Sequence, residues 1–147
     1  MKVALDRPPS LDKASSELLL AIGQLVRKLR SQSNPNEMNL SQMSALARLE
    51  QFGPMTTADL SRAEAMKPQS MGTILASLEQ DGFVHRQPHP TDGRQILFAL
   101  TDKGKEERRQ RGIAKRVWLA AAMAKFTPAE RQTLNAAIPL MKRLGDG

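Results

Sequence analysis

One turn-rich segment between two helical patterns constrains the fold of this chain more than any other feature. Residues 78–104 read LEQDGFVHRQPHPTDGRQILFALTDKG. The elements that this order predicts are a helix end at Gly82, a strand over Phe83–Arg86, a polar loop, a strand over Gln95–Leu100 and a helix capped by Thr101. In the second strand Ile96, Phe98 and Leu100 share one face, which is typical of a half-buried strand. A short β-hairpin therefore separates two helices.

The rest of the chain carries helical periodicity. Apolar residues recur at helical spacing in the N-terminal third and again on both sides of the hairpin. The other helices expected are Leu11–Arg30, Ser41–Gln51 with Ser41 as its cap, Thr57–Ala65 behind a Thr56–Asp59 capping box, Pro68–Gln80, Thr101–Lys125, and one that starts at Thr127 and is kinked by Pro139. The expected fold is mainly α with one short hairpin.

Three short motifs around the hairpin loop resemble the MarR family of winged helix-turn-helix transcriptional regulators. They are GFVxR before the loop, Asp92-x-Arg94 within it and LTxKG after it. The resemblance implies a single MarR-like domain over 1–147, with a winged helix DNA-binding core over 40–100 and dimerisation helices over 11–32 and 101–145. It also implies a homodimer on a palindromic operator, modulated by a small aromatic or anionic ligand between the dimer and DNA lobes.

Charge favours an anionic partner without locating its site. The net charge is +7 and the pI about 10.3, which suits double-stranded DNA. Residues 41–100 nevertheless carry five basic and six acidic side chains, whereas 101–125 carry eight basic and three acidic ones. The basic run from Lys103 is open to two interpretations, phosphate contacts or a solvated helix face interrupted by Glu106 and Glu107.

Several features that other functions need are missing from the sequence. The sequence holds no cysteine, which excludes disulfides and thiolate metal sites. His85 and His89 are the only histidines, and a zinc site needs three or four converging ligands. No catalytic constellation is recognisable, so we expect no enzyme activity and no cofactor.

No apolar run approaches the ~18 residues of a membrane span and no secretory leader opens the chain, which predicts a cytoplasmic protein with no membrane partner.

The helix expected over Pro68–Gln80 carries the first set of DNA-binding candidates. Its apolar residues gather on one side, and small or uncharged polar residues gather on the other. The candidates are Lys67, Pro68, Gln69, Ser70, Thr73 and Ser77. Glutamine can pair with adenine, and a threonine methyl group can touch the methyl group of thymine. The alternative is an ordinary surface helix, which would usually carry more Glu, Lys and Arg.

The hairpin loop carries the second set of candidates. Arg94 lies near its tip with no evident packing role, and the resemblance implies that it enters the minor groove, where negative potential is concentrated. Asp92 would orient Arg94 through a bidentate pair; the alternative is a solvated loop ion pair of little energetic value. Arg86, at the base of the wing, is expected to contact a phosphate or to pair with Asp81 or Glu79.

Two apolar ridges near the ends of the chain predict a dimer interface. Their members are Leu18, Ile22, Leu25 and Leu29 near the N-terminus, and Leu134, Ile138, Met141 and Leu144 near the C-terminus. A monomer would expose both ridges, and association is the usual remedy. Trp118, Met38 and Met43 are candidate linings of a ligand site, although Met and Trp on apolar faces are more often core residues.

Together these features predict a homodimeric, sequence-specific DNA-binding transcriptional regulator, with repression as the expected mode. The alternative is a winged-helix protein-interaction module that has lost DNA binding, which the near-neutral region over 41–100 favours.

Overall fold

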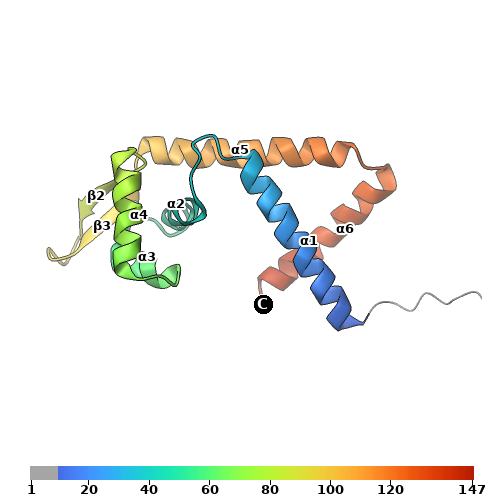
Figure 1. Ribbon diagram of the computed structural model, residues 1–147, viewed down its shortest axis with the longest axis horizontal. Coiled ribbons are helices and arrows are strands. Elements are labelled where there is room, and N and C mark those ends of the chain that lie inside the picture. The colour runs from blue at the N-terminus through green and yellow to red at the C-terminus, as the bar shows by residue number, and fades with distance from the viewer. Residues whose placement is uncertain (1–9) are drawn as a thin grey trace, which may run out of the picture. The chain divides into compact units, whose positions relative to one another are not determined.

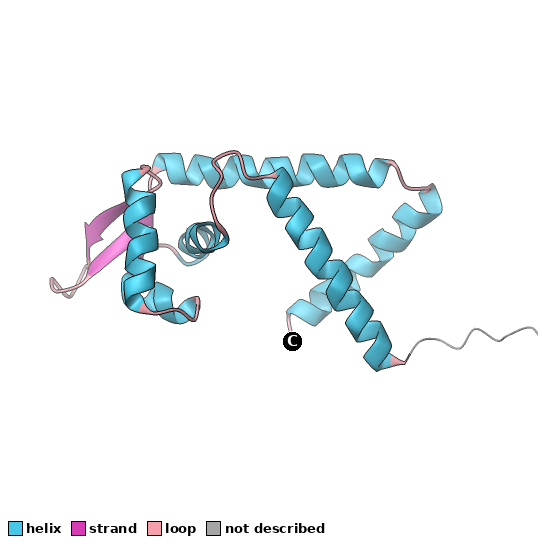
Figure 2. Ribbon diagram, in the orientation of Figure 1, coloured by secondary structure: helices cyan, strands magenta, loops and turns pink. Residues whose placement is uncertain are grey.

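The computed structural model describes residues 10–147. They divide into two compact units, one of residues 34–114 and one of residues 10–33 with 115–147. Helix α5 (Asp102–Ala124) begins in the first unit and ends in the second (Figure 1). Most elements are helices, and the strands form one short sheet (Figure 2). The expected mainly helical fold with one hairpin is confirmed.

The unit of residues 34–114 contains the helices around the hairpin. Its elements are α2 (Leu40–Phe52), β1 (Met55–Thr56), α3 (Thr57–Ala63), α4 (Pro68–Gln80), β2 (Val84–Pro88), β3 (Ile96–Leu100) and the first half of α5. The sheet is antiparallel in the order β1-β3-β2. The hairpin pairs Val84 with Leu100 and Pro88 with Ile96. Strand β1 was not expected, because two residues are too few to show a period-two pattern.

One aliphatic core holds this unit together. Leu46 of α2, Leu60 of α3 and Leu75 of α4 are completely buried in it, together with apolar residues of the sheet. Phe98 and Leu100 close the core from β3 as expected. Ile96, which was expected on the same buried face, is 46% exposed, because it lies at the loop end of the hairpin, where little chain remains to cover it.

Helix α2 starts earlier than expected. Asn39, and not Ser41, is its cap: Asn39 Oδ1 accepts from the backbone N–H of Gln42 at 2.9 Å, and Gln42 Oε1 accepts from the N–H of Asn39 at 3.0 Å. The expected serine is already inside the helix. The reciprocal capping box satisfies two backbone donors at once, whereas a serine cap alone satisfies one.

Helix α3 is capped by Thr56 as expected, but only half of the expected capping box forms. The hydroxyl of Thr56 accepts from the backbone N–H of Asp59 at 3.1 Å. The carboxylate of Asp59 instead pairs with Arg62, one turn further along the helix. An aspartate side chain is one methylene shorter than the glutamate usual at this position, which disfavours the return bond.

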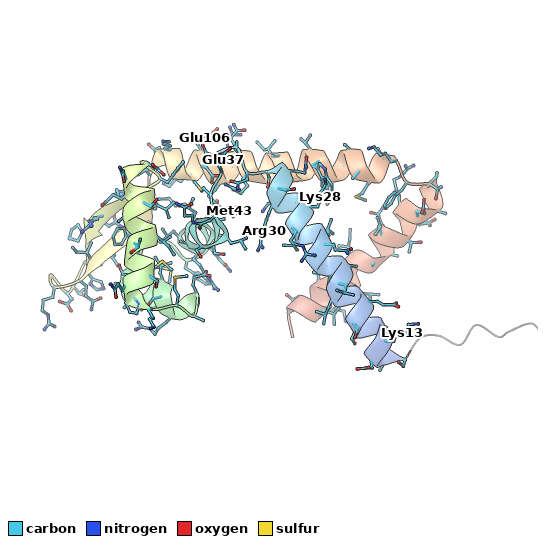
Figure 3. All side chains as sticks on the ribbon, viewed as in Figure 1. Lys13, Lys28, Arg30, Glu37, Met43 and Glu106 are labelled. Atoms are coloured by element: carbon cyan, nitrogen blue, oxygen red, sulfur yellow. The ribbon has the colours of Figure 1, made fainter. Side chains whose placement is uncertain are left out.

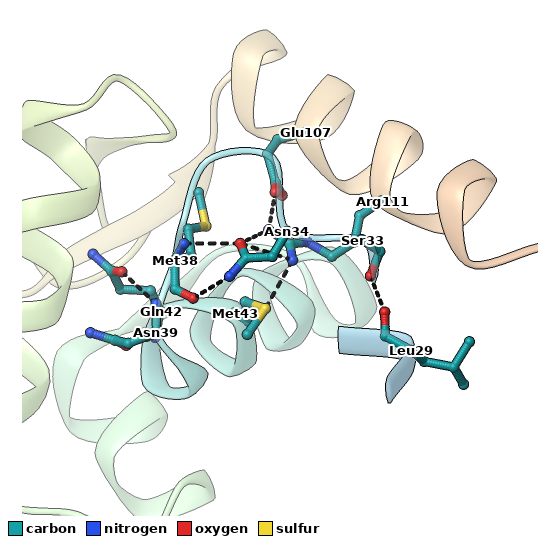
Figure 4. Close-up of polar contacts among 9 residues, drawn as sticks. All are labelled: Leu29, Ser33, Asn34, Met38, Asn39, Gln42, Met43, Glu107 and Arg111. Atoms are coloured by element: carbon teal, nitrogen blue, oxygen red, sulfur yellow. Dashed lines mark hydrogen bonds and ion pairs between the residues drawn. The ribbon is translucent and has the colours of Figure 1, made fainter. Parts of the chain in front are cut away.

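A buried polar cluster joins the segment before α2 to helix α5 (Figure 4). Glu107 and Arg111, one turn apart on α5, form an ion pair with both side chains 2% exposed. Asn34 Oδ1 accepts from Arg111 at 3.4 Å and from the N–H of Met38 at 2.9 Å. Met43 Sδ accepts from Arg111 Nη1 at 2.9 Å. Met38 and Met43, which were candidate ligand-site linings, belong to the core or pack against it.

The hairpin is fixed to the helices on both of its sides. Gly82 ends α4 with a φ of 82°, a left-handed conformation that favours glycine. Thr101 Oγ1 donates to the carbonyl of Gly82 at 2.5 Å and accepts from the N–H of Gly104 at 3.0 Å, so that it caps α5 as expected. Lys103 lies 4.6 Å from the centre of the Phe83 ring, within cation–π range.

The second unit consists of α1 (Leu11–Gln32), the end of α5 and α6 (Pro128–Gly145). Lys13 and Lys28 project from α1 (Figure 3). Both bonds of the expected capping box form between Thr127 and Glu130 at the start of α6, and α6 contains Pro139 as an internal residue. Among residues 10–147, no helix is both long and apolar enough to cross a membrane.

Candidate DNA interface

Helix α4 presents an uncharged polar face to solvent. Met71, Leu75 and Leu78 are completely buried against the core, which leaves the opposite side of the helix exposed. The exposed residues at and before its first turns are Lys67, Pro68, Gln69, Ser70 and Thr73. Lys67 is the N-cap residue and its side chain makes no capping bond. The start of α4 therefore offers one cation followed by neutral hydrogen-bonding groups.

Two hydroxyls of α4 already have partners within the protein. Ser77 is half-buried, and its Oγ accepts from Gln42 Nε2 of α2 at 3.1 Å. Thr73 Oγ1 donates to the carbonyl of Gln69 at 3.2 Å, so the methyl group of this exposed side chain is held in a defined orientation. Among the predicted site residues of α4, Ser77 lies nearest to the protein interior.

The wing loop presents Arg94 in a defined orientation. The side chain is 91% exposed, and its Nε and Nη2 donate to the two carboxylate oxygens of Asp92 at 3.1 and 3.4 Å. The backbone N–H of Arg94 also donates to Asp92, at 3.0 Å. The hydrogen bonds from the side chain and then from the backbone of Arg94 lower the pKa of Asp92. The bidentate pair expected from the Asp-x-Arg motif is present.

Arg86 connects the base of the wing to α4. Its Nε donates to both carboxylate oxygens of Glu79 at 3.1 and 3.3 Å, and its guanidinium lies 5.4 Å from the centre of the Phe98 ring. Of the two partners expected for Arg86, the structure selects Glu79. The side chain remains 54% exposed, so one edge of the guanidinium faces solvent.

Comparison with known proteins identifies the family. A model of the MarR family matches residues 38–96, the stretch from the end of the loop before α2 to the first residue of β3. The HTH-type transcriptional regulator Mb0904 of Mycobacterium bovis is 40% identical over 134 residues, which cover 91% of this chain and 94% of that protein. The chain belongs to the MarR family. It is accordingly a DNA-binding transcriptional regulator and not an enzyme.

The chain is also similar to a further regulator and to solved structures. The HTH-type transcriptional repressor Mb2911 of M. bovis is 28% identical over 129 residues, 87% of this chain and 91% of that one. The crystal structure of RV1404 from Mycobacterium tuberculosis superposes with a TM-score of 0.80 at 27% identity and full coverage of both chains. A mutant of MepR from S. aureus, bound to an oligodeoxyribonucleotide, has the same fold at a TM-score of 0.69 and 17% identity, over 90% of this chain and 96% of that one.

The basic side chains of the near-neutral MarR core are mostly held in ion pairs. The four arginines of residues 41–100 are each paired with a carboxylate, as Arg48–Glu64, Arg62–Asp59, Arg86–Glu79 and Arg94–Asp92. Lys67 forms no ion pair among the described residues. Exposed ion pairs contribute little to stability, so an arginine in such a pair can exchange its carboxylate for a DNA phosphate at small cost.

The basic run of α5 is also partly neutralised, by carboxylates of α5 and of α2. Arg108 pairs with Glu50, and Arg109 donates two bonds to Glu106, one turn away. Glu106 projects from α5 (Figure 3), and hydrogen bonds from Arg109 and then Gln110 lower its pKa to about 2. This pairing favours a solvated helix face for this part of the run.

Arg62 is a candidate that sequence reasoning missed. It lines a groove with Thr57 and Asp59 from the start of α3 and with Arg94 and Gln95 from the wing. The groove thus carries two exposed arginines from elements that are far apart in the sequence. Only the antiparallel pairing of β1 with β3 brings them together, and β1 is too short to predict.

His89 was also missed in its structural role. Sequence reasoning considered it only as a metal ligand, whereas its ring nitrogen accepts hydrogen bonds from the wing backbone. Within residues 10–147 no three His, Cys, Asp or Glu side chains are grouped so that they could hold a metal ion.

Proposed function

We propose that this MarR-family regulator is a homodimeric repressor that reads a palindromic operator. Helix α4 enters the major groove and the wing places Arg94 in the adjacent minor groove. One observation carries this proposal: within one compact unit, the exposed face of α4 is free of charge, while a neighbouring loop holds a 91% exposed arginine in a bidentate pair.

The residues of this interface divide into two roles. Gln69, Ser70 and Thr73 are neutral, exposed and able to reach base edges, so they set sequence preference. Lys67 and Arg86 flank them and contact phosphates, so they mainly set affinity. The remaining predicted contacts act through these: Pro68 starts the helix, Ser77 fixes α4 to α2, and Asp92 orients Arg94.

The dimer is supported by the apolar surface of the second unit. Ile138, Met141 and Leu144 of α6 are 47%, 50% and 73% exposed. Ile138 and Met141 also line an almost wholly apolar hollow, together with Leu25, Trp118, Leu119, Ala122, Met123, Phe126 and Leu134. A chain this size would leave an unusually large apolar patch in water as a monomer. A second copy of the same unit is the occupant that we propose, with an isologous interface of roughly 2,000 Å² or more.

Four further features belong to this proposal, and the first of them follows from the dimer. Two DNA-binding units related by a two-fold axis require an operator with matching symmetry. Repression is supported by similarity to the transcriptional repressor Mb2911 of M. bovis. We also propose that a small aromatic or anionic ligand modulates DNA binding, which family membership supports, and that the protein works in the cytoplasm with the DNA that it binds.

Binding-site selection with the wild-type protein tests this function. We expect enrichment of a palindromic consensus, and we expect Thr73→Ala to relax one or two positions symmetrically in both half-sites. Thr133→Ala is the matched control, because Thr133 is an exposed helical threonine whose hydroxyl also donates to the carbonyl four residues earlier. An unchanged consensus from variants of Gln69, Ser70 and Thr73 alike would contradict the assignment of α4.

A further inference from the structure

The wing loop is organised around the ring of His89. Its Nδ1 accepts a hydrogen bond from the backbone N–H of Thr91 at 3.2 Å and another from that of Asp92 at 3.0 Å, and the Thr91 hydroxyl lies 3.4 Å from the same nitrogen. The backbone N–H of His89 donates to the carbonyl of Gln95 at 3.3 Å, which closes the loop across the hairpin. The ring is half-buried. His89 therefore caps the turn in the way that an Asn or Asp side chain caps many loops.

This arrangement requires one protonation state of the ring. A histidine nitrogen accepts a hydrogen bond only when it carries no proton, and both ring nitrogens are donors in the imidazolium form. In the neutral ring of His89, Nδ1 is the acceptor and the proton is on Nε2. A proton on Nδ1 would point at the two backbone N–H groups and remove both hydrogen bonds.

The capped turn leads directly to the residue proposed to contact DNA. Asp92 is held through its backbone by His89, and its carboxylate in turn holds Arg94. The carbonyl of Asp92 also accepts from the N–H of Gln95 at 3.0 Å. Loss of the cap would therefore release the segment that orients the Arg94 guanidinium.

We propose that His89 is a positioning residue that makes wing binding to DNA pH-dependent, with the neutral ring holding Arg94 in place and the protonated ring releasing it. This rests on the proposed contact of Arg94 with DNA. Histidine is the side chain whose charge changes most readily near physiological pH, so affinity should fall as the ring gains a proton. The direction of this change in affinity distinguishes the proposal from a simple charge effect, because added positive charge by itself strengthens binding to DNA.

The charged groups around His89 come from its own loop. Asp92 interacts electrostatically with it, and Arg94 is engaged by Asp92. Gln95, the residue before β3, contributes only uncharged groups, its backbone and its side-chain amide. The carboxylate of Asp92 supplies no replacement for the lost acceptor, because it is already engaged by Arg94 and Gln95.

The chain offers a matched control, because His85 and His89 are its only histidines. Affinity for the selected operator should be measured at about pH 7.5 and about pH 5.5 for the wild type, H89N and H85N. Wild type and H85N should weaken about five- to tenfold at the lower pH, which corresponds to one or two neutral hydrogen bonds. H89N keeps an acceptor that does not titrate and should not weaken. Equal weakening of H89N and the wild type would overturn the proposal.

A measurement on the free protein separates this proposal from the proposed function. The backbone amide protons of Thr91 and Asp92 should exchange slowly at the higher pH, relative to the intrinsic rate at that pH, and lose this protection at the lower pH in the wild type but not in H89N. Unchanged protection would overturn the role of His89 whether or not DNA is bound. Lost protection with unchanged operator affinity would overturn the coupling to DNA and count against the wing contact itself.

Discussion

Gly104, in the first turn of α5, lies directly against the carbonyl of Phe83 at the start of the wing. A Cβ atom built on Gly104 would lie 2.1 Å from that carbonyl oxygen, far inside van der Waals contact. The same carbonyl accepts from the N–H of Thr101 at 3.1 Å. The glycine of the LTxKG motif is thus required by close backbone packing, which places the wing against the start of α5.

Gly104→Ala should therefore destabilise the fold. The new methyl group meets backbone, which cannot rotate away, and overpacking of this kind costs about 1–3 kcal/mol. Urea unfolding followed by circular dichroism measures the free energy of unfolding. Gly72→Ala is the control: Gly72 is an interior residue of α4 with nothing within 4 Å of an added Cβ, so the change should stabilise the fold by about 0.5–1 kcal/mol. Equal effects of the two substitutions would contradict the packing role of Gly104.

The buried pair of Glu107 and Arg111 gives a second prediction on stability. Arg111→Ala leaves the Glu107 carboxylate buried without its cation, which should cost about 3–5 kcal/mol. The double substitution Glu107→Leu with Arg111→Met removes both charges and should recover most of that loss. Both are measured by urea unfolding against the wild type. A change below about 1 kcal/mol for Arg111→Ala, the size of an exposed pair, would show that the cluster does not fix α5 in this unit.

The sequence predicted the elements whose signals are local. Thr101 and Thr127 were correctly expected as caps, and Gly82 as a helix end, because each depends on residues within one helical turn. Competition between neighbouring caps was harder to judge. Ser41 and Asn39 are both good cap residues, and only the return bond from Gln42 selects Asn39.

Features that depend on tertiary pairing were not predictable. Strand β1 forms only because β3 lies beside it, and Arg62 reaches the wing groove only through that pairing. The partner of Arg86 was narrowed to two carboxylates, since both lie at the end of α4, but the choice of Glu79 depends on the register of β2. His89 was weighed only as a metal ligand and set aside, because no sequence pattern marks a ring nitrogen as a turn cap.

The dimer is tested by placing charge on the exposed ridge of α6. Ile138→Asp with Met141→Asp should yield monomer or aggregate and abolish palindrome binding, because two carboxylates would be buried in the interface. Gln132→Glu with Asn135→Asp adds the same charge to exposed polar positions of the same helix and should leave the dimer intact. Multi-angle light scattering reports the mass in solution. A folded wild-type monomer at micromolar concentration would contradict the proposal that a dimer binds a palindromic operator.

Substitution of Arg94 tests the central claim most directly. The claim is that the wing of this MarR-family regulator contacts DNA while α4 contacts the base edges. Arg94 is almost fully exposed and forms its ion pair with Asp92 of the same loop, so its removal should leave folding and dimerisation unchanged. Arg109→Ala is the matched control, because Arg109 is likewise exposed and paired with a carboxylate three residues away. Any loss specific to Arg94 then reports on DNA and not on a lost ion pair.

The most direct measurement is fluorescence anisotropy titration of the selected operator over a range of salt concentrations. Arg94→Ala should weaken binding at least about tenfold, which is about 1.4 kcal/mol, while Arg109→Ala should not. The slope of log affinity against log salt should fall by about two for Arg94→Ala, one phosphate-region contact from each protomer. Unchanged affinity and slope for Arg94→Ala at moderate salt would contradict the account.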